Sequence, residues 1–185
     1  MLTFGTVLSD ALFICLLSFI YALMEIEMEG AYGWAKNLPT TKNVLGSFTL
    51  YHLYMLGFLL LLFGGWFFTR FVSGWISGWS MVFQFGFYMI LWLLIEDFLW
   101  FVFNPHFTLK RYTKKDIPWH PSWVGPVPLH NITGLLGLLV LCLLEGSGRL
   151  FGGLGIGAVF TLVAVLFAPL YHRYYMSTHK DYMIT

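Results

Sequence analysis

Glu96 and Asp97 are adjacent acids inside one of the most apolar stretches of the chain, Leu91–Asn104. An ionised side chain at the centre of a membrane helix costs about 2.5–3.5 kcal/mol, and the Phe and Trp residues beside this pair in the sequence cannot offset that cost. A cation, a metal ion, a proton or a water-filled cavity must therefore accompany the two acids. We expect them to be the catalytic carboxylates of a buried site.

Other residues of the kind that bind metals are spread along the chain. Imidazole nitrogens and carboxylate oxygens together suit transition metals, so we predict a divalent ion (Zn, Fe or Mn) as the cofactor. Such a set could hold one ion, or two ions with carboxylates bridging them. The predicted metal ligands are Glu25, Glu29, His52, Glu96, His130 and His172.

The spacing of the acids limits which of them can act together. Glu25 and Glu29 are four residues apart, so they share a face if the first helix continues through them. Glu96 and Asp97 diverge by about 100° around a helix, so at most one of them is expected to bind the metal directly. The other could orient a histidine or face a neighbouring helix. In a hydrolase, a free carboxylate would serve as the general base that takes a proton from metal-bound water.

The composition indicates an integral membrane protein. Of the 185 residues, 58% are hydrophobic and only 10% are charged, whereas a soluble domain carries about 25% charged residues. The net charge of +1 gives no basis for binding nucleic acid. The N-terminus has no basic region and no small-residue cleavage site, so we expect the first apolar stretch to be a permanent span.

Five apolar stretches predict an all-α bundle of five transmembrane helices, forming a single domain over residues 1–185. The predicted spans are 6–24, 45–68, 76–103, 129–145 and 151–171, and the longest polar loop is 104–128. Asn104 precedes a proline and is therefore expected to end the third helix. In this arrangement His52 lies about two turns inside the second span.

The distribution of lysine and arginine predicts the orientation. With five spans, eight of these residues fall on one side of the membrane, and only Arg70 and Arg149 fall on the other. The positive-inside rule then predicts an external N-terminus and a cytoplasmic C-terminus in the cell (inner) membrane. All six histidines and seven of the nine acids fall on the cytoplasmic side, so each helix is expected to bring at least one ligand to a similar depth.

Each of these residues also has an interpretation without chemistry. His52 could be a core histidine bonded to a hydroxyl or a carbonyl group. Glu96 and Asp97 could be balanced by Arg, Lys or Tyr from another helix, and Glu25–Glu29 could be a solvated helix end. The histidines of the loop and the tail are expected to be solvated or interfacial: His106, His120 and His179.

The preferred function is a membrane metalloenzyme that acts on a lipid or another hydrophobic substrate at the cytoplasmic leaflet, by hydrolysis or by oxygen activation. One alternative is a haem protein that uses His52 with His130 or His172 as axial ligands. Another is an accessory subunit of an electron- or proton-transfer complex, in which Glu96, Asp97 and His52 form a proton path. The expected partners are membrane lipids, a hydrophobic substrate and either further copies of the chain or a larger membrane complex.

Overall fold

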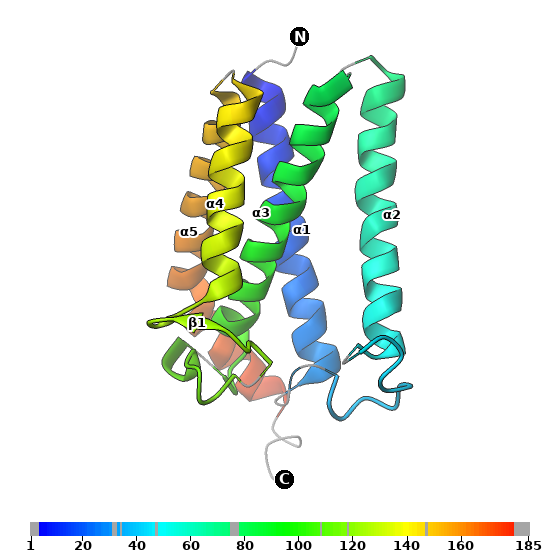
Figure 1. Ribbon diagram of the computed structural model, residues 1–185. Helices are drawn as coiled ribbons and strands as arrows, with labels where there is room; N and C mark the ends of the chain where they lie inside the picture. The colour runs from blue at the N-terminus through cyan, green and yellow to red at the C-terminus, as the bar shows by residue number, and fades with distance from the viewer. Residues whose placement is uncertain are drawn as a thin grey trace.

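The computed structural model describes residues 4–30, 33, 35–46, 48–74, 78–107, 109–117, 119–146 and 148–179, with residues 4–6 as backbone only. Five α-helices make up most of it (Figure 1), which confirms the all-α prediction. They are α1 (Phe4–Glu29), α2 (Leu50–Val72), α3 (Gly78–Phe103), α4 (Leu129–Glu145) and α5 (Arg149–Thr178). Consecutive helices run in opposite directions, so the ends of α1, α3 and α5 meet the starts of α2 and α4.

Four of the described helices are long and apolar enough to cross a membrane, namely α1 from Val7 onward, α2, α3 and α5. They have between 23 and 30 residues, whereas α4 has 17. A straight span of the hydrocarbon core needs about 20 residues, so α4 falls short of that length. Because four of its helices have the length and the composition of membrane spans, the chain is a multi-pass membrane protein.

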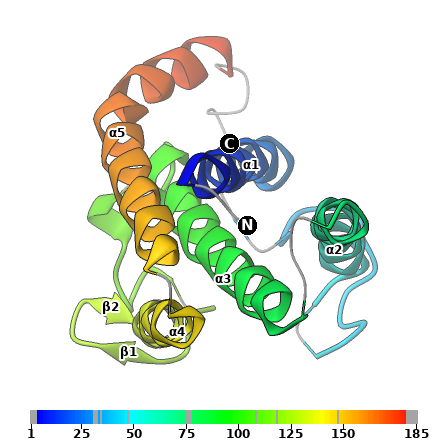
Figure 2. The ribbon, with the colours of Figure 1, turned by 90° about the horizontal axis from the view of Figure 1, so that it is seen from above.

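Helix α3 lies at the centre of the bundle. Figure 2 shows it between α1 on one side and α4 and α5 on the other, with α2 at the edge. Twelve residues of α3 are buried, whereas the described part of α2 buries only Leu59, Phe63 and Phe67. The acids Glu96 and Asp97 are thus carried by the helix that has neighbours on most of its sides.

The segment between α3 and α4 is irregular but anchored. It contains the short helix η1 (Leu109–Arg111) and a two-stranded antiparallel hairpin of β1 (Trp123–Val124) and β2 (Val127–Pro128). Gly125 lies in the hairpin turn with a φ of +60°, a backbone conformation that glycine adopts at little cost. Figure 1 shows this segment covering the end of the bundle where α4 starts.

The boundaries of two helices differ from the prediction in ways that matter for the site. Helix α2 begins at Leu50 and not at residue 45, because Leu45 and Phe48 pair in an isolated β-bridge and Thr49 caps the helix. His52 therefore lies in the first turn of α2, and the predicted depth of two turns is wrong. Helix α1 continues to Glu29, which places the last acids of the first span on a helical face.

Asp10 and Arg70 form a buried ion pair at the opposite end of the bundle. The carboxyl group of Asp10 is only 2% exposed, and Nη1 of Arg70 donates to its Oδ2 at 2.8 Å. Nη2 of Arg70 donates to the other carboxylate oxygen, so the contact is bidentate. The guanidinium also lies 4.8 Å from the ring of Trp66. This pair joins the start of α1 to the end of α2.

Candidate metal centre

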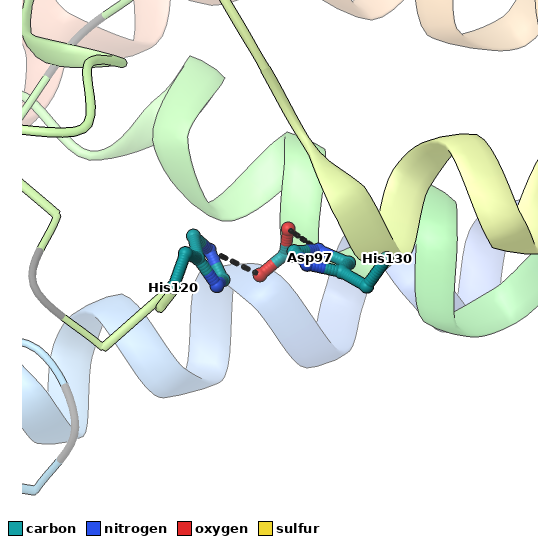
Figure 3. A group of neighbouring side chains, drawn as sticks. All are labelled: Asp97, His120 and His130. Carbon is teal, nitrogen blue, oxygen red and sulfur yellow. Dashed lines mark hydrogen bonds and ion pairs between the residues drawn. The ribbon is translucent and has the colours of Figure 1, made fainter. Parts of the chain in front are cut away.

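Asp97, His120 and His130 are brought together at the end of the bundle that the hairpin covers. Nε2 of His130 lies 3.3 Å from Oδ2 of Asp97, and Nε2 of His120 lies 3.5 Å from Oδ1 (Figure 3). One ligand atom from each residue lies within 4.8 Å of the other two, and no other such group of three occurs in the described part of the chain. We call this set the Asp–His–His group.

Three different elements supply these side chains. Asp97 lies on α3, one turn and a half before the helix ends at Phe103, and His130 is the second residue of α4. His120 lies in the irregular segment just before β1. The hairpin joins the two histidines, because the backbone N–H of Leu129 donates to the carbonyl of Ser122 at 2.9 Å. The imidazole rings of His120 and His130 have centroids 4.5 Å apart.

Aromatic packing fixes the loop that carries His120. The indole N–H of Trp123 donates to the carbonyl of His120 at 2.7 Å, and the ring of Trp119 stacks on Phe101 of α3. Tyr112 packs against Phe101 and accepts a hydrogen bond from Asn131 of α4 at 2.7 Å. Burial and the nearby charge of Asp97 raise the pKa of the Tyr112 phenol, so this anchor stays neutral at physiological pH.

The distances within the Asp–His–His group suit a bound metal. Zinc binds nitrogen and oxygen ligands at about 2.0–2.1 Å, which places two ligands of a tetrahedral site about 3.3 Å apart. The contacts of 3.3 and 3.5 Å reach different oxygens of Asp97, and one ligand atom from each residue lies within 4.8 Å of the other two, so the three side chains lie close to that spacing. Three protein ligands also leave a coordination position for water or substrate, as in catalytic zinc sites.

A second set of acids borders the first. Glu25 and Glu29 of α1 and Glu96 of α3, which we call the acidic group, line a cavity of about 150 Å³ together with His52, Asp97 and His120. Glu25 and Glu96 are close enough to share a hydrogen bond. The described residues that line this cavity include no lysine and no arginine. Four carboxyl groups therefore surround one cavity with only histidines as cationic side chains.

His52 is held by the cap of α2. The backbone N–H of Thr49 donates to Nδ1 of His52 at 3.2 Å, and the hydroxyl of Thr49 lies 2.8 Å from the same nitrogen. A neutral imidazole whose Nδ1 accepts a hydrogen bond carries its proton on Nε2. Nε2 lies 3.7 Å from Oε1 of Glu29, so the ring presents a donor to that carboxylate. Oε1 of Glu29 also accepts the backbone N–H of Ala35 at 2.9 Å.

Several buried polar atoms at this cavity make no hydrogen bond to a described residue. Among them are Oε1 of Glu96 and Nε1 of Trp100, whose residues are 9% and 6% exposed. Buried polar groups are nearly always hydrogen-bonded in folded proteins. An acceptor and a donor that lack protein partners at one cavity indicate that the cavity holds water or an ion.

Two larger cavities lie along α3 and α4, and one of them adjoins the Asp–His–His group. One of about 500 Å³ is lined by Glu96, Asp97, His120 and His130 at one end and by apolar side chains of α3 at the other. The second, of about 310 Å³, lies between α3, α4 and α5 and is almost entirely apolar. Leu94 lines both. A polar centre is thus continuous with space that suits hydrocarbon.

Most of the ligands predicted from the sequence lie at the 150 Å³ cavity or next to it. Glu25, Glu29, His52 and Glu96 line it, and His130 reaches Asp97 from α4. His172 does not join them, because its Nε2 lies 2.9 Å from the carbonyl oxygen of Val102. That carbonyl belongs to the last turn of α3, where no further helical N–H is available to it, so His172 caps the end of α3.

His120 is the member of the Asp–His–His group besides Asp97 that the predicted ligand set does not contain. It was expected to be solvated or interfacial, yet its side chain is only 11% exposed and faces Asp97. The sequence signal is the string Trp119-His120-Pro121-Ser122-Trp123, in which two tryptophans flank the histidine. Such rings bury large surfaces and fix a loop against the helices.

Comparisons of the chain with protein families, with curated proteins and with solved structures find no match.

Proposed function

We propose that the protein is an integral membrane metalloenzyme that holds a divalent ion (Zn, Fe or Mn) at Asp97, His120 and His130. It acts on a lipid or another hydrophobic substrate at the cytoplasmic leaflet. All 185 residues form one domain with five spans, α4 included, in the cell (inner) membrane. The N-terminus is external and the C-terminus is cytoplasmic, as the lysine and arginine distribution favours.

The observation that carries this proposal is the position of the Asp–His–His group. Its two histidine nitrogens lie 3.3 and 3.5 Å from one carboxylate, and the cavity of about 500 Å³ beside it runs from these residues to apolar side chains of α3. A ligand pocket that is mostly apolar with a few convergent polar groups is the usual form of a small-molecule site. A hydrophobic substrate fits this combination, with its reactive polar part at the metal.

The chemistry follows from the ligand set. A metal with three protein ligands and an open position lowers the pKa of bound water and polarises a carbonyl or phosphoryl oxygen. Of the two predicted catalytic carboxylates, Asp97 serves as a ligand. Glu96 lines both the 150 Å³ and the 500 Å³ cavities, so one of its oxygens is placed to accept the proton of the activated water.

The test is the metal content of the full-length protein in detergent, measured by inductively coupled plasma mass spectrometry. His120→Ala and His130→Ala should each lose about one equivalent, because their affinity should fall by more than the roughly 10–100-fold that outer-shell changes cause. His106→Ala is the matched control: it removes an imidazole from the same loop, outside the Asp–His–His group. Equal metal content in all four proteins would refute the site.

Activity is tested with the same proteins. Vesicles made from a total lipid extract are incubated with the metal-loaded wild type, and new products are sought by mass spectrometry. We expect a product that disappears in His120→Ala and remains in His106→Ala. A wild type that binds no metal and converts no lipid would favour the alternative in which Glu96, Asp97 and His52 form a proton path in a larger complex.

A further inference from the structure

We propose that Glu25, Glu29 and Glu96 form a second cation subsite for a hard divalent ion, Mn²⁺ or Mg²⁺, next to the metal at the Asp–His–His group. This inference rests on the proposed function and makes its centre a two-metal site. The two subsites differ in ligand chemistry: one offers two nitrogens and a carboxylate, and the other offers carboxylates alone.

Geometry brings the three carboxylates to one place. Glu25 and Glu29 are four residues apart on α1, which is helical through both, so they share a face. Glu96 approaches from α3 and lies within hydrogen-bond reach of Glu25. All three line the cavity of about 150 Å³, which has room for an ion and several waters.

The unpartnered atoms at this cavity point to a ligand. Oε1 of Glu96 is buried and accepts no hydrogen bond from a described residue, and the residue is only 9% exposed. A cation is the natural partner for such an oxygen. The indole N–H of Trp100 is buried at the same cavity without an acceptor, and a water or hydroxide bound to the ion would supply one.

The charge at the cavity favours two ions over one. Its lining contains four carboxyl groups and, among the described residues, no lysine or arginine. With one divalent ion at the Asp–His–His group, the acidic group has only protons, such as the one shared in a hydrogen bond between Glu25 and Glu96, to balance its charge. Carboxylate groups without nitrogen ligands suit Mg²⁺, Ca²⁺ or Mn²⁺, and a second divalent ion provides the missing charge.

His52 acts on this subsite as a positioning residue. Its Nδ1 accepts from the Thr49 backbone and its Nε2–H faces Oε1 of Glu29. This is the usual arrangement of an outer-shell group that orients a carboxylate ligand. Glu96 keeps its proposed role as well, because a carboxylate that binds an ion through one oxygen retains the other as a proton acceptor.

Two-metal sites clamp the attacking and the leaving oxygen of a displacement reaction. The second ion therefore narrows the class of substrate to one with an ester or phosphoester oxygen at the centre, attached to a hydrophobic part. The reaction class that fits is hydrolysis or transfer at that oxygen.

The experiment counts Mn²⁺ ions in each subsite. Chelator-treated full-length protein is titrated with Mn²⁺, bound metal is counted by mass spectrometry, and electron paramagnetic resonance reports whether two ions interact. Wild type should bind about two interacting ions. Glu25→Gln and Glu29→Gln should each retain about one ion without the interaction, and His120→Ala should retain the other. The glutamines conserve side-chain size, and elution volume in gel filtration verifies folding.

Glu27→Gln is the matched control. Glu27 lies between the two ligands on α1, but its carboxylate is half exposed and pairs with His179 at 3.0 Å. It should bind two ions like the wild type. One ion that is lost in His120→Ala and unaffected by Glu25→Gln and Glu29→Gln would overturn the second subsite and leave the proposed function standing. One ion lost only in the glutamine variants would overturn the Asp–His–His group instead, and no bound ion would overturn both.

Discussion

The two ends of the bundle solve the same electrostatic problem in different ways. At one end, the buried carboxylate of Asp10 has its own cation, because Arg70 reaches it with two nitrogens. At the other end, four carboxyl groups surround a cavity whose described lining contains no lysine or arginine. Both sets of acids lie on helices that are apolar enough to cross a membrane.

This difference separates a structural acid from a functional one. A bidentate arginine–carboxylate pair satisfies its charges within the fold and needs nothing from outside. The acidic group and Asp97 are arranged around space, with one carboxylate oxygen and one indole N–H that have no partner in the described protein. A fold that tolerates such an arrangement is expected to be completed by a ligand.

The largest expected effect lies at the Asp10 end. Arg70→Met leaves the Asp10 carboxylate buried without its cation, and breaking a buried ion pair in this way costs about 3–5 kcal/mol. Metal content should not change, because the pair lies near the start of α1 and the end of α2, which Figure 1 shows at the other end of the bundle. The free energy of unfolding is measured by denaturant titration in detergent, together with the metal content of the same sample.

Two further variants control this measurement. Arg173→Met removes an exposed arginine from α5 and should change stability by less than about 0.5 kcal/mol. Asp10→Asn combined with Arg70→Met removes both charges and should recover most of the loss, since no buried charge remains. If Arg70→Met also abolished metal binding, the ion pair at one end would be required for the metal centre at the other, and the two ends would not be independent.

Much of the Asp97 end could be predicted from the sequence. Hydropathy locates α4 at 129–145, as observed, and the order of the helices brings Glu25, His52, Glu96 and His130 to one end. The four-residue spacing of Glu25 and Glu29 indicates a shared face, and the helix that this requires is present. These features depend on local composition and helical period, which a single sequence contains.

What the sequence could not supply depends on tertiary contacts. His120 reaches Asp97 because Trp119 and Trp123 hold its loop against the bundle. The two tryptophans are visible in the sequence, but the helix against which they place the histidine is not. His172 lies near the same end of the bundle as the other predicted ligands. Its imidazole does not face the cavity but contacts the carbonyl oxygen of Val102 at the end of α3. Hydropathy places the start of α2 too early because Leu45 and Phe48 are apolar, although these two residues pair in an isolated β-bridge before the helix.

An intermediate effect, on Mn²⁺ affinity, is expected at the Asp97 end when the positioning residue His52 is changed. His52→Gln removes the imidazole that faces Glu29 and should weaken Mn²⁺ binding at the acidic group by about 10–100-fold. Binding at the Asp–His–His group should not change, because His52 is not part of it. Isothermal titration of each subsite, with the other disabled by His120→Ala or Glu25→Gln, separates the two affinities. Equal weakening at both would show that His52 acts on the fold as a whole.

The smallest expected effect concerns the cap that holds His52. Thr49→Ala removes the hydroxyl that accepts the backbone N–H of His52 at 3.4 Å, and loss of such a cap costs about 1 kcal/mol. Thr49→Ser should retain the wild-type stability, since serine supplies the same hydroxyl. Thr69→Ala is the control within α2, because its exposed hydroxyl bonds only to the carbonyl of Trp66.

Metal affinity distinguishes this cap from an ordinary one. Because the Thr49 hydroxyl also contacts Nδ1 of His52, its loss frees the imidazole to rotate away from Glu29. Thr49→Ala should therefore weaken Mn²⁺ binding at the acidic group in the same direction as His52→Gln, but by less. In the double variant with His52→Gln, the loss of Thr49 should have no further effect on affinity. If the two substitutions weakened Mn²⁺ binding additively, Thr49 would not act through His52. The hydroxyl of Thr49 would then not help to position the imidazole toward Glu29.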